Sequence, residues 1–270
     1  MMKNKFIQRN TVQDIFKKKN NSKIVSLACY TSQIAKIVDN YADIILVGDS
    51  MGMVLYGHKN TLSVSKQMLI EHGKSVVNST TKSLVVVDLP FGSYEGSKEQ
   101  AFDVSSEILS KTGASAIKLE GGEELSNTIS FLVERGIPVM GHVGLMPQRI
   151  NNIGKFSSRG HSSLEARKIL KDAKSISLSG TFAIVVEAVK ESLGKSITKN
   201  VSVPTIGIGA GRYCDGQILV INDMLGFSDT FTPKFVKKYA NLPKYIDKAI
   251  ESYKDDVKSG KFPSEKQVYK

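Results

Sequence analysis

Six short apolar runs, each ending in a polar residue or a glycine-rich turn, occur in order along this 270-residue chain. They read IILVGDS, LVVVDLP, AIKLEGG, PVMGHVG, AIVVEAV and PTIGIGAG. A strand that is buried on both faces of a parallel sheet is a continuous Val, Ile and Leu run, not an alternating one. In a (β/α)8 barrel, the reacting groups stand at the carboxyl ends of several strands. The runs therefore predict a parallel sheet and the residues at its functional edge.

Strand and helix patterns alternate along the chain and predict an α/β fold. The expected strands are 24–29, 44–47, 84–88, 116–119, 139–143, 183–187, 205–208 and 218–221. The segments expected to follow them are helices at 32–41, 65–79, 98–112, 125–135, 163–179 and 191–199, a short turn, and a helix at 234–255. Eight such repeats permit closure into a (β/α)8 TIM barrel, which typically needs about 250 residues. The alternative, an open doubly wound sheet, usually has glycines after its first strand, where this chain reads CYTSQ.

One domain spanning residues 1–270 is expected, because no Pro- or Ser-rich linker interrupts the pattern. It divides into an N-terminal helical extension (1–23), the barrel (24–240) and a C-terminal helical tail (241–270). Within the extension, T-x-x-D at Thr11 predicts a helix over 11–19 that lies across one end of the barrel. Two long connections, 48–64 and 144–162, are expected to be lids or binding elements.

The formal charge of +11 raises the question of nucleic-acid binding, but only six of the 37 basic residues are arginines. The lysines are spread over helical segments and both ends, which is typical of a solvated surface; a positive field could also attract an anionic small substrate. No apolar stretch approaches the roughly 18 residues of a membrane span. We therefore expect a cytoplasmic protein with no nucleic-acid or membrane partner. The two cysteines, Cys29 and Cys214, lack zinc-site spacing.

Asp49 and Asp88 follow the second and third expected strands, which are neighbours in a barrel. Two carboxylates with water and substrate oxygens are the usual environment of Mg²⁺. The alternative is that each aspartate caps a helix or forms a turn. Lys118 and Glu120 are two residues apart at the fourth strand, so their side chains point the same way. Either they form an ion pair with each other, or Lys118 holds an anion and Glu120 is an outer metal ligand.

His142 and Glu187 end the fifth and sixth apolar runs. A single histidine is more often a hydrogen-bonded core residue, but charged neighbours make His142 a candidate site-lining residue. Glu187 follows Val185 and Val186 and is the candidate proton acceptor, or else a carboxylate at a helix start. The glycine turn over 207–211 resembles a phosphate-binding turn, a weak signal because tight turns favour glycine.

Longer segments around these residues resemble the ketopantoate hydroxymethyltransferase family. The matching stretches, in the expected order, are DIILVGDSMGMVLYGHKNTLSVS, VVVDLPFGSYEGSKEQAF, AIKLEGG, GIPVMGHVGLMPQ, VVEAV, VPTIGIGAG, CDGQILVINDMLG and PKFVKKYA. The resemblance implies a (β/α)8 barrel of the phosphoenolpyruvate/pyruvate type and a homodecamer. It also implies Mg²⁺ on Asp49 and Asp88, with Glu120 in the outer sphere. A 2-oxo acid would be held by Asp49, Ser50, Asp88 and Lys118.

The activity that the resemblance implies is Mg²⁺-dependent hydroxymethylation of 3-methyl-2-oxobutanoate to 2-dehydropantoate, in pantothenate and coenzyme A biosynthesis. The co-substrate would be 5,10-methylenetetrahydrofolate, and Glu187 would remove the proton from the 2-oxo acid to give an enolate. The alternative is a Mg²⁺-dependent oxo-acid lyase or phosphonomutase of the same barrel group. Such lyases are expected to carry a K-x-C-G-H loop, and the chain has none.

Overall fold

The fold is described from a computed structural model that covers residues 8–227 and 232–269. The chain divides into two compact units, residues 1–220 and residues 221–270. The first unit holds every strand and the second holds the C-terminal helices. The expected organisation as one domain stays a prediction.

The first unit is a closed barrel of eight parallel strands in sequential order, with β8 paired to β1. The strands are β1 Ile24–Ala28, β2 Ile44–Val47, β3 Leu84–Asp88, β4 Ala116–Lys118, β5 Val139–Gly144, β6 Ala183–Glu187, β7 Thr205–Ile208 and β8 Gly216–Val220. Every residue of β2, β3, β4 and β5 is buried, as the continuous apolar runs required. The predicted (β/α)8 barrel is therefore confirmed, and each strand lies within two residues of its expected place.

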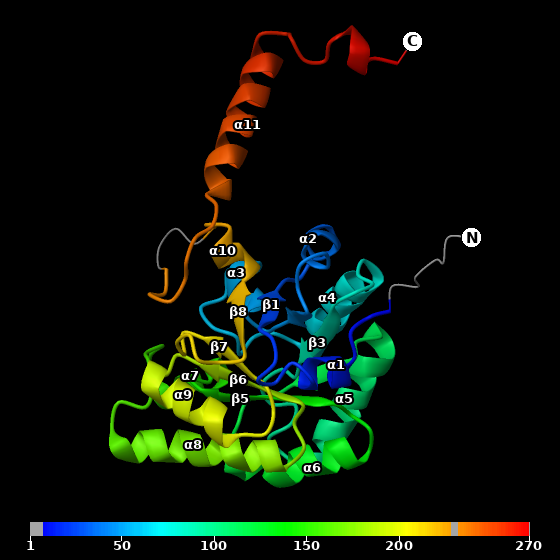
Figure 1. The fold of residues 1–270 in the computed structure, drawn as a ribbon. Coiled ribbons are helices and arrows are strands. Elements are labelled where there is room, and N and C mark those ends of the chain that lie inside the picture. Colours follow the sequence, from blue (N-terminus) through cyan, green and yellow to red (C-terminus); the bar gives the residue numbers. More distant parts are fainter. Residues whose placement is uncertain (1–7, 228–231, 270) are drawn as a thin grey trace, which may run out of the picture. The chain divides into compact units, whose positions relative to one another are not determined.

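Helices surround the barrel and pack side by side along its outside (Figure 1). They are α2 Ser32–Val38, α4 Lys66–Asn78, α5 Lys98–Thr112, α6 Ser126–Glu134, α8 Ser163–Leu178 and α9 Glu191–Asn200, with a 3₁₀ turn η1 Glu123–Leu125 before α6. The first residues of α4, α5 and α8 follow a serine, namely Ser65, Ser97 and Ser162, whose side chain accepts a backbone N–H of the first turn. These caps explain why the three helices begin at these positions.

The N-terminal segment crosses the end of the barrel at which the strands begin. Helix α1, Val12–Phe16, opens with a capping box between Thr11 and Asp14, as predicted. On one side, the Arg9 guanidinium donates to the carbonyl of Ser83, just before β3. On the other side, Lys19 donates to Asp215, just before β8. The segment therefore joins the connections that lead into β3 and β8, at the end of the barrel where the strands begin.

Both long connections at the carboxyl end contain helical turns. The segment after β2 holds α3, Met51–Val54, and the segment after β5 holds the 3₁₀ turn η2, Pro147–Arg149, and α7, Ile150–Ile153. By contrast, β7 and β8 are joined by residues 209–215 alone, with no helix between them. Cys29 and Cys214 are buried free thiols.

The second unit contains α10 Ile221–Met224, α11 Leu242–Lys258 and a 3₁₀ turn η3 Glu265–Gln267. The predicted helix over 234–255 is wrong at its start, because α11 begins at Leu242, with Pro243 in its first turn. Proline is favoured there because its missing N–H would have no partner inside the helix. Ile246, Ile250 and Tyr253 share one exposed face of α11. In the described part of the chain, no helix is long and apolar enough to span a bilayer.

Candidate active site

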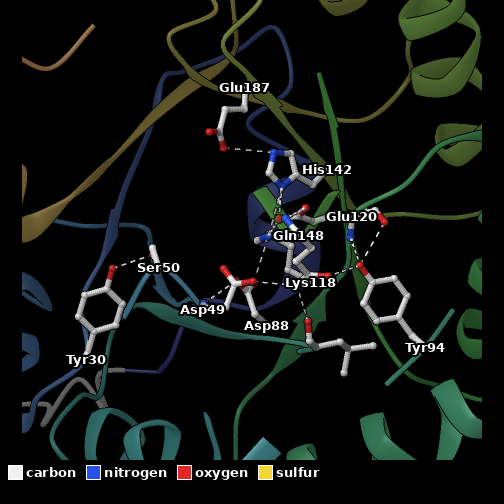
Figure 2. A network of polar contacts seen from close by, with 11 residues as sticks. Tyr30, Asp49, Ser50, Asp88, Tyr94, Lys118, Glu120, His142, Gln148 and Glu187 are labelled. Atoms are coloured by element: carbon white, nitrogen blue, oxygen red, sulfur yellow. Dashed lines mark hydrogen bonds and ion pairs between the residues drawn. The ribbon is translucent and has the colours of Figure 1, made fainter. Parts of the chain in front are cut away.

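The polar residues predicted from the strand ends converge at the carboxyl end of the barrel (Figure 2). The register explains this, because β3 and β4 pair Asp88 with Lys118, and β5 and β6 pair Gly144 with Glu187. His142 lies within β5, two residues before its end. The group comprises Asp49, Asp88, Lys118, Glu120 and His142, all at most 4% exposed, with Glu187 at the rim, where its side chain is 17% exposed.

Asp49 and Asp88 lie next to each other at the ends of β2 and β3. The backbone N–H of Asp49 donates a 3.0 Å hydrogen bond to Asp88 Oδ2. Asp88 Oδ1 is buried and accepts no hydrogen bond from the described residues, although Lys118 Nζ lies 3.2 Å away. Neither aspartate caps a helix, since α3 follows Ser50 without a side-chain cap. Asp88 Oδ1 thus pairs by charge with Lys118 but lacks a hydrogen bond within the described residues.

Lys118 is the central cation of the group. Its Nζ lies 3.2 Å from Asp88 Oδ1, 3.8 Å from Glu120 Oε1 and 3.3 Å from His142 Nδ1. A charged amine at this depth is stable only beside opposite charges. The lysine is therefore shared between the aspartate pair and Glu120, and it is not confined to the ion pair with Glu120 that the spacing alone allowed.

His142 connects Glu120 to Glu187. Its Nδ1 lies 3.3 Å from Glu120 Oε1, and its Nε2 lies 3.3 Å from Glu187 Oε2. The Nε2 atom is buried, and its geometry toward Glu187 falls short of a hydrogen bond. The imidazole therefore stands between the buried half of the group and the carboxylate nearest to solvent (Figure 2).

Burial and charge shift the pKa values of the acidic residues in different directions. Burial, reinforced by the neighbouring carboxylates of Asp88 and Glu120, raises the pKa of Asp49 well above its usual value. Burial also raises the pKa of Asp88, although Lys118 opposes the shift. Burial would raise the pKa of Glu120 too, but the charges of His142 and Lys118 outweigh it, and the pKa is lowered. Glu120 is therefore ionised while Asp49 resists ionisation.

The two basic groups are held in their protonated forms. Burial and the charge of Lys118 disfavour a charged imidazole, but Glu120 and Glu187 outweigh them and raise the pKa of His142 to about 9. Burial likewise lowers the pKa of Lys118, and the surrounding carboxylates, Asp88 foremost, raise it by more. Both residues are cations at neutral pH.

Four carboxylates thus face two cations, which leaves two negative charges in excess when every group is ionised. This excess, and the Oδ1 atom of Asp88 that accepts no hydrogen bond from the described residues, suit a divalent cation. In the described residues, no three Asp, Glu, His or Cys side chains form a complete metal cage. Mg²⁺ is commonly bound by one or two carboxylates with water and substrate oxygens, so the donor set fits it.

Three residues of the network were not anticipated from the sequence. Gln148, after β5, donates its amide to Asp49, and Tyr94, after β3, contacts Gln148 and Glu120. Tyr30, after β1, shares a 2.8 Å hydrogen bond with Ser50. No periodic signal marks them, although Tyr94 and Gln148 lie within stretches that match the family, and all three follow strands at the same end of the barrel.

The glycine turn after β7 is shaped by packing. A Cβ atom on Gly211, whose φ is +83°, would lie 2.4 Å from Cγ of Glu191 at the start of α9. Glycine is thus required for close approach, whether or not the turn binds a phosphate. The phosphate hypothesis stays a prediction.

Several solved structures share the fold at low sequence identity. A phosphonopyruvate hydrolase in complex with oxalate and Mg²⁺ superposes with a TM-score of 0.62 at 13% identity, covering 96% of this chain and 93% of that one. A 2,3-dimethylmalate lyase, a member of the PEP mutase/isocitrate lyase superfamily, gives 0.58 at 10% identity over 96% of this chain and 91% of that one. These similarities support the (β/α)8 barrel fold.

Another group of proteins is much more similar to this chain in sequence than these solved structures are. Proteins named 3-methyl-2-oxobutanoate hydroxymethyltransferase are 51% identical in Bartonella henselae, covering 98% of this chain and 96% of that protein, and 49% identical in Rhizobium rhizogenes, covering 97% and 96%. The ketopantoate hydroxymethyltransferase family model matches residues 9–265. These matches contain every residue of the site described above. The chain belongs to the ketopantoate hydroxymethyltransferase family.

Proposed function

We propose that this chain transfers a hydroxymethyl group to 3-methyl-2-oxobutanoate from 5,10-methylenetetrahydrofolate, giving 2-dehydropantoate for pantothenate synthesis. The observation that carries the proposal is the buried group of Asp49, Asp88 and Lys118. Within it, Lys118 Nζ lies 3.3 Å from Nδ1 of His142, and the imidazole pairs with Glu187 on its other side. Family membership supports the reaction, and the geometry supplies the residues for each role.

We propose that Asp49 and Asp88 hold Mg²⁺, with Glu120 in the outer sphere. When bound, the ion would polarise the carboxylate and ketone oxygens of the 2-oxo acid and make its C3 proton more acidic. Asp49, Ser50, Asp88 and Lys118 would line the place of the 2-oxo acid. Ser50 is oriented by Tyr30, which holds its hydroxyl at 2.8 Å.

Lys118 is the electrostatic partner of the negative charge that develops on the ketone oxygen. It is positioned before substrate arrives, because Asp88 and Glu120 fix its ammonium group. Prearranged charges of this kind stabilise a transition state without reorganisation during the reaction. The role requires that the lysine stays protonated, which the raised pKa provides.

Glu187 is the proton acceptor for C3. It is the acidic group of the network nearest to solvent, and its Oε2 lies 3.3 Å from the protonated imidazole of His142. His142 would orient this carboxylate and balance its charge, and the charge of Glu120 keeps the imidazole protonated. Removal of the proton leaves an enolate carbon that attacks the one-carbon unit of the folate.

Proton exchange tests the first half of the reaction without folate. The C3 proton signal of 3-methyl-2-oxobutanoate in D₂O, followed by NMR with enzyme and Mg²⁺, should disappear. EDTA should abolish the exchange, and Glu187→Gln should slow it strongly. Glu191→Gln is the matched control, because Glu191 pairs with exposed Arg212 outside the network. A wild-type enzyme without exchange would refute the enolisation step.

The lyase or phosphonomutase alternative shares the barrel, but nothing in the site favours it over the family reaction.

Assembly is a separate proposal. We propose a homodecamer of the 29.5 kDa chain, supported by the family resemblance and by the exposed apolar face of α11. Sedimentation velocity measures the assembly directly, and a monomeric species at micromolar concentration would contradict it.

A further inference from the structure

Gln148 is a buried amide whose orientation is fixed by its neighbours. It is 3% exposed and lies in η2, in the segment that follows β5. Its Nε2 donates to Asp49 Oδ2 at 2.8 Å and to the carbonyl oxygen of Leu89 at 2.9 Å. Both partners accept hydrogen bonds, so only the NH₂ end of the amide can face them.

The other end of the amide is held by Tyr94. The Tyr94 hydroxyl donates to Gln148 Oε1 at 2.5 Å and accepts the backbone N–H of Glu120 at 3.2 Å. Burial raises the pKa of Tyr94 well above its usual value, so the phenol stays a donor. The amide cannot rotate without losing a partner at both ends.

The contacts of Gln148 complete a pattern across the acidic residues. The backbone N–H of Gln148 donates to Glu120 Oε2 at 3.1 Å, and the backbone N–H of Asp49 donates to Asp88 Oδ2. Together with the amide bond to Asp49 Oδ2, each of three carboxylates has one oxygen bound to an N–H donor. Two of these three donors belong to Gln148. The remaining oxygens of Asp88 and Glu120 face the cations Lys118 and His142. The remaining oxygen of Asp49, Oδ1, is the one that the amide of Gln148 does not bind.

A carboxylate oxygen that accepts a hydrogen bond is a poorer ligand than its free partner oxygen, so such a carboxylate binds a cation mainly through one oxygen. Mg²⁺ accepts such single-oxygen ligands in octahedral geometry, whereas Ca²⁺ takes about six to eight oxygens and often binds both oxygens of a carboxylate. We propose that Gln148 is a positioning residue that keeps Asp49 as a single-oxygen ligand, with Glu120 held in the outer sphere by its backbone N–H, and thereby makes the site discriminate against Ca²⁺. The inference rests on the proposed metal site and adds the residue that sets its selectivity.

Metal competition tests this role without measuring catalysis. Mn²⁺ binding is measured from the EPR signal of free Mn²⁺, and Mg²⁺ and Ca²⁺ affinities follow from displacement of bound Mn²⁺. Gln148→Leu keeps the volume but removes the side-chain donor to Asp49. The ratio of Mg²⁺ to Ca²⁺ affinity should fall about tenfold, which corresponds to about 1.4 kcal/mol. Tyr94→Phe leaves Gln148 in place but frees its amide to rotate, and should lower the ratio by a smaller factor.

Thr181→Val is the matched control for lost stability. Thr181 is a buried residue whose hydroxyl donates to the carbonyl of Ile176, at the opposite end of β6 from Glu187. Its ratio of affinities should equal that of the wild type even if its unfolding temperature falls. A ratio in Gln148→Leu within about twofold of the wild type would overturn the inference. If that variant does not fold, an unchanged ratio in Tyr94→Phe overturns it instead.

The outcome for the wild type separates this inference from the proposed function. A wild-type protein that binds no Mn²⁺ would refute the metal site, and the role of Gln148 with it. Wild-type binding with an unchanged ratio in the variants refutes only the role of Gln148.

Discussion

Lys118 Nζ lies 3.2 Å from Asp88 Oδ1, and the two residues occupy paired positions on β4 and β3. Both side chains are at most 5% exposed, so their charges interact with little screening by water. A buried ion pair adds little net stability, but removing one partner leaves an uncompensated charge. A substitution at either residue should therefore affect both the stability of the fold and the proposed reaction.

Replacing Lys118 by Met should slow C3 exchange by more than about 100-fold, or about 2.7 kcal/mol, because the charge on the ketone oxygen loses its partner. Exchange is measured by NMR, and unfolding by circular dichroism. Lys66→Met is the control, since Lys66 pairs with Glu107 on the helical surface. Exchange within threefold of the wild type would remove Lys118 from the reaction.

Asp88→Asn should raise the Mg²⁺ concentration that gives half-maximal exchange by more than about tenfold, because a neutral amide oxygen is a poorer ligand than a carboxylate. This corresponds to a loss above about 1.4 kcal/mol. The measurement is a Mg²⁺ titration of the exchange rate. Asp103→Asn on the surface of α5 should titrate like the wild type. If the midpoint for Asp88→Asn is unchanged, Asp88 is not a ligand.

Asp215 should contribute stability that depends on pH. Burial opposes its ionisation, but Lys19 at 2.8 Å and the N–H of Thr205 at 2.9 Å outweigh burial and lower its pKa. Because the pKa of Asp215 is lower in the folded state, its ionisation stabilises the protein at pH values above the unfolded-state pKa, near 3.8. This contribution disappears as the pH falls through the folded-state pKa. Asp215→Asn should therefore unfold about 2 to 3 kcal/mol more easily at pH 7.

Urea unfolding at pH 7 and at about pH 3 measures this difference. The gap between Asp215→Asn and the wild type should shrink at the lower pH, because protonation makes the two side chains alike. Glu71→Gln, which breaks an exposed pair with Lys74, should change little at either pH. A gap that grows as the pH falls would contradict the assignment.

Gly144 should tolerate alanine less well than Gly136. Both have positive φ, at +101° and +83°, so both substitutions strain the backbone by about 1 kcal/mol. A Cβ on Gly144 would also lie 2.3 Å from the carbonyl oxygen of Glu187, whereas Gly136 has nothing within 4 Å. Gly144→Ala should therefore lower both the unfolding temperature and the exchange rate, and Gly136→Ala only the unfolding temperature. Equal effects on exchange would show that Glu187 does not depend on this contact.

The barrel was predictable because burial on both faces leaves an unbroken apolar signal, as in LVVVD at β3. The charged residues were predictable for the same reason, since Asp88 and Glu187 interrupt such runs at their last position. Their order along the chain also predicts that they meet, because successive strands of a barrel are neighbours.

Gln148, Tyr94 and the start of α11 were not predicted, for different physical reasons. A glutamine or tyrosine in a polar loop has no periodicity that reports burial, and its partners come from other loops. For α11, the residues from 234 onward continue an amphipathic pattern, although those from 232 to 241 form turns and irregular structure. Pro243 was the available signal for the true start.

The direct connection between β7 and β8 has a mechanical consequence. Side-chain contacts at the rim join Tyr30 after β1 to Ser50 after β2, and His142 on β5 to Glu187 on β6, but none of these contacts joins β7 to β8. That junction has two paired positions, Ile206 with Gly216 and Gly207 with Gln217, as few as the β4–β5 junction, and it alone of the two lacks a helix between its strands. When the barrel unfolds on heating, β7 and β8 should therefore separate first, while the strands that hold the proposed active site are still paired.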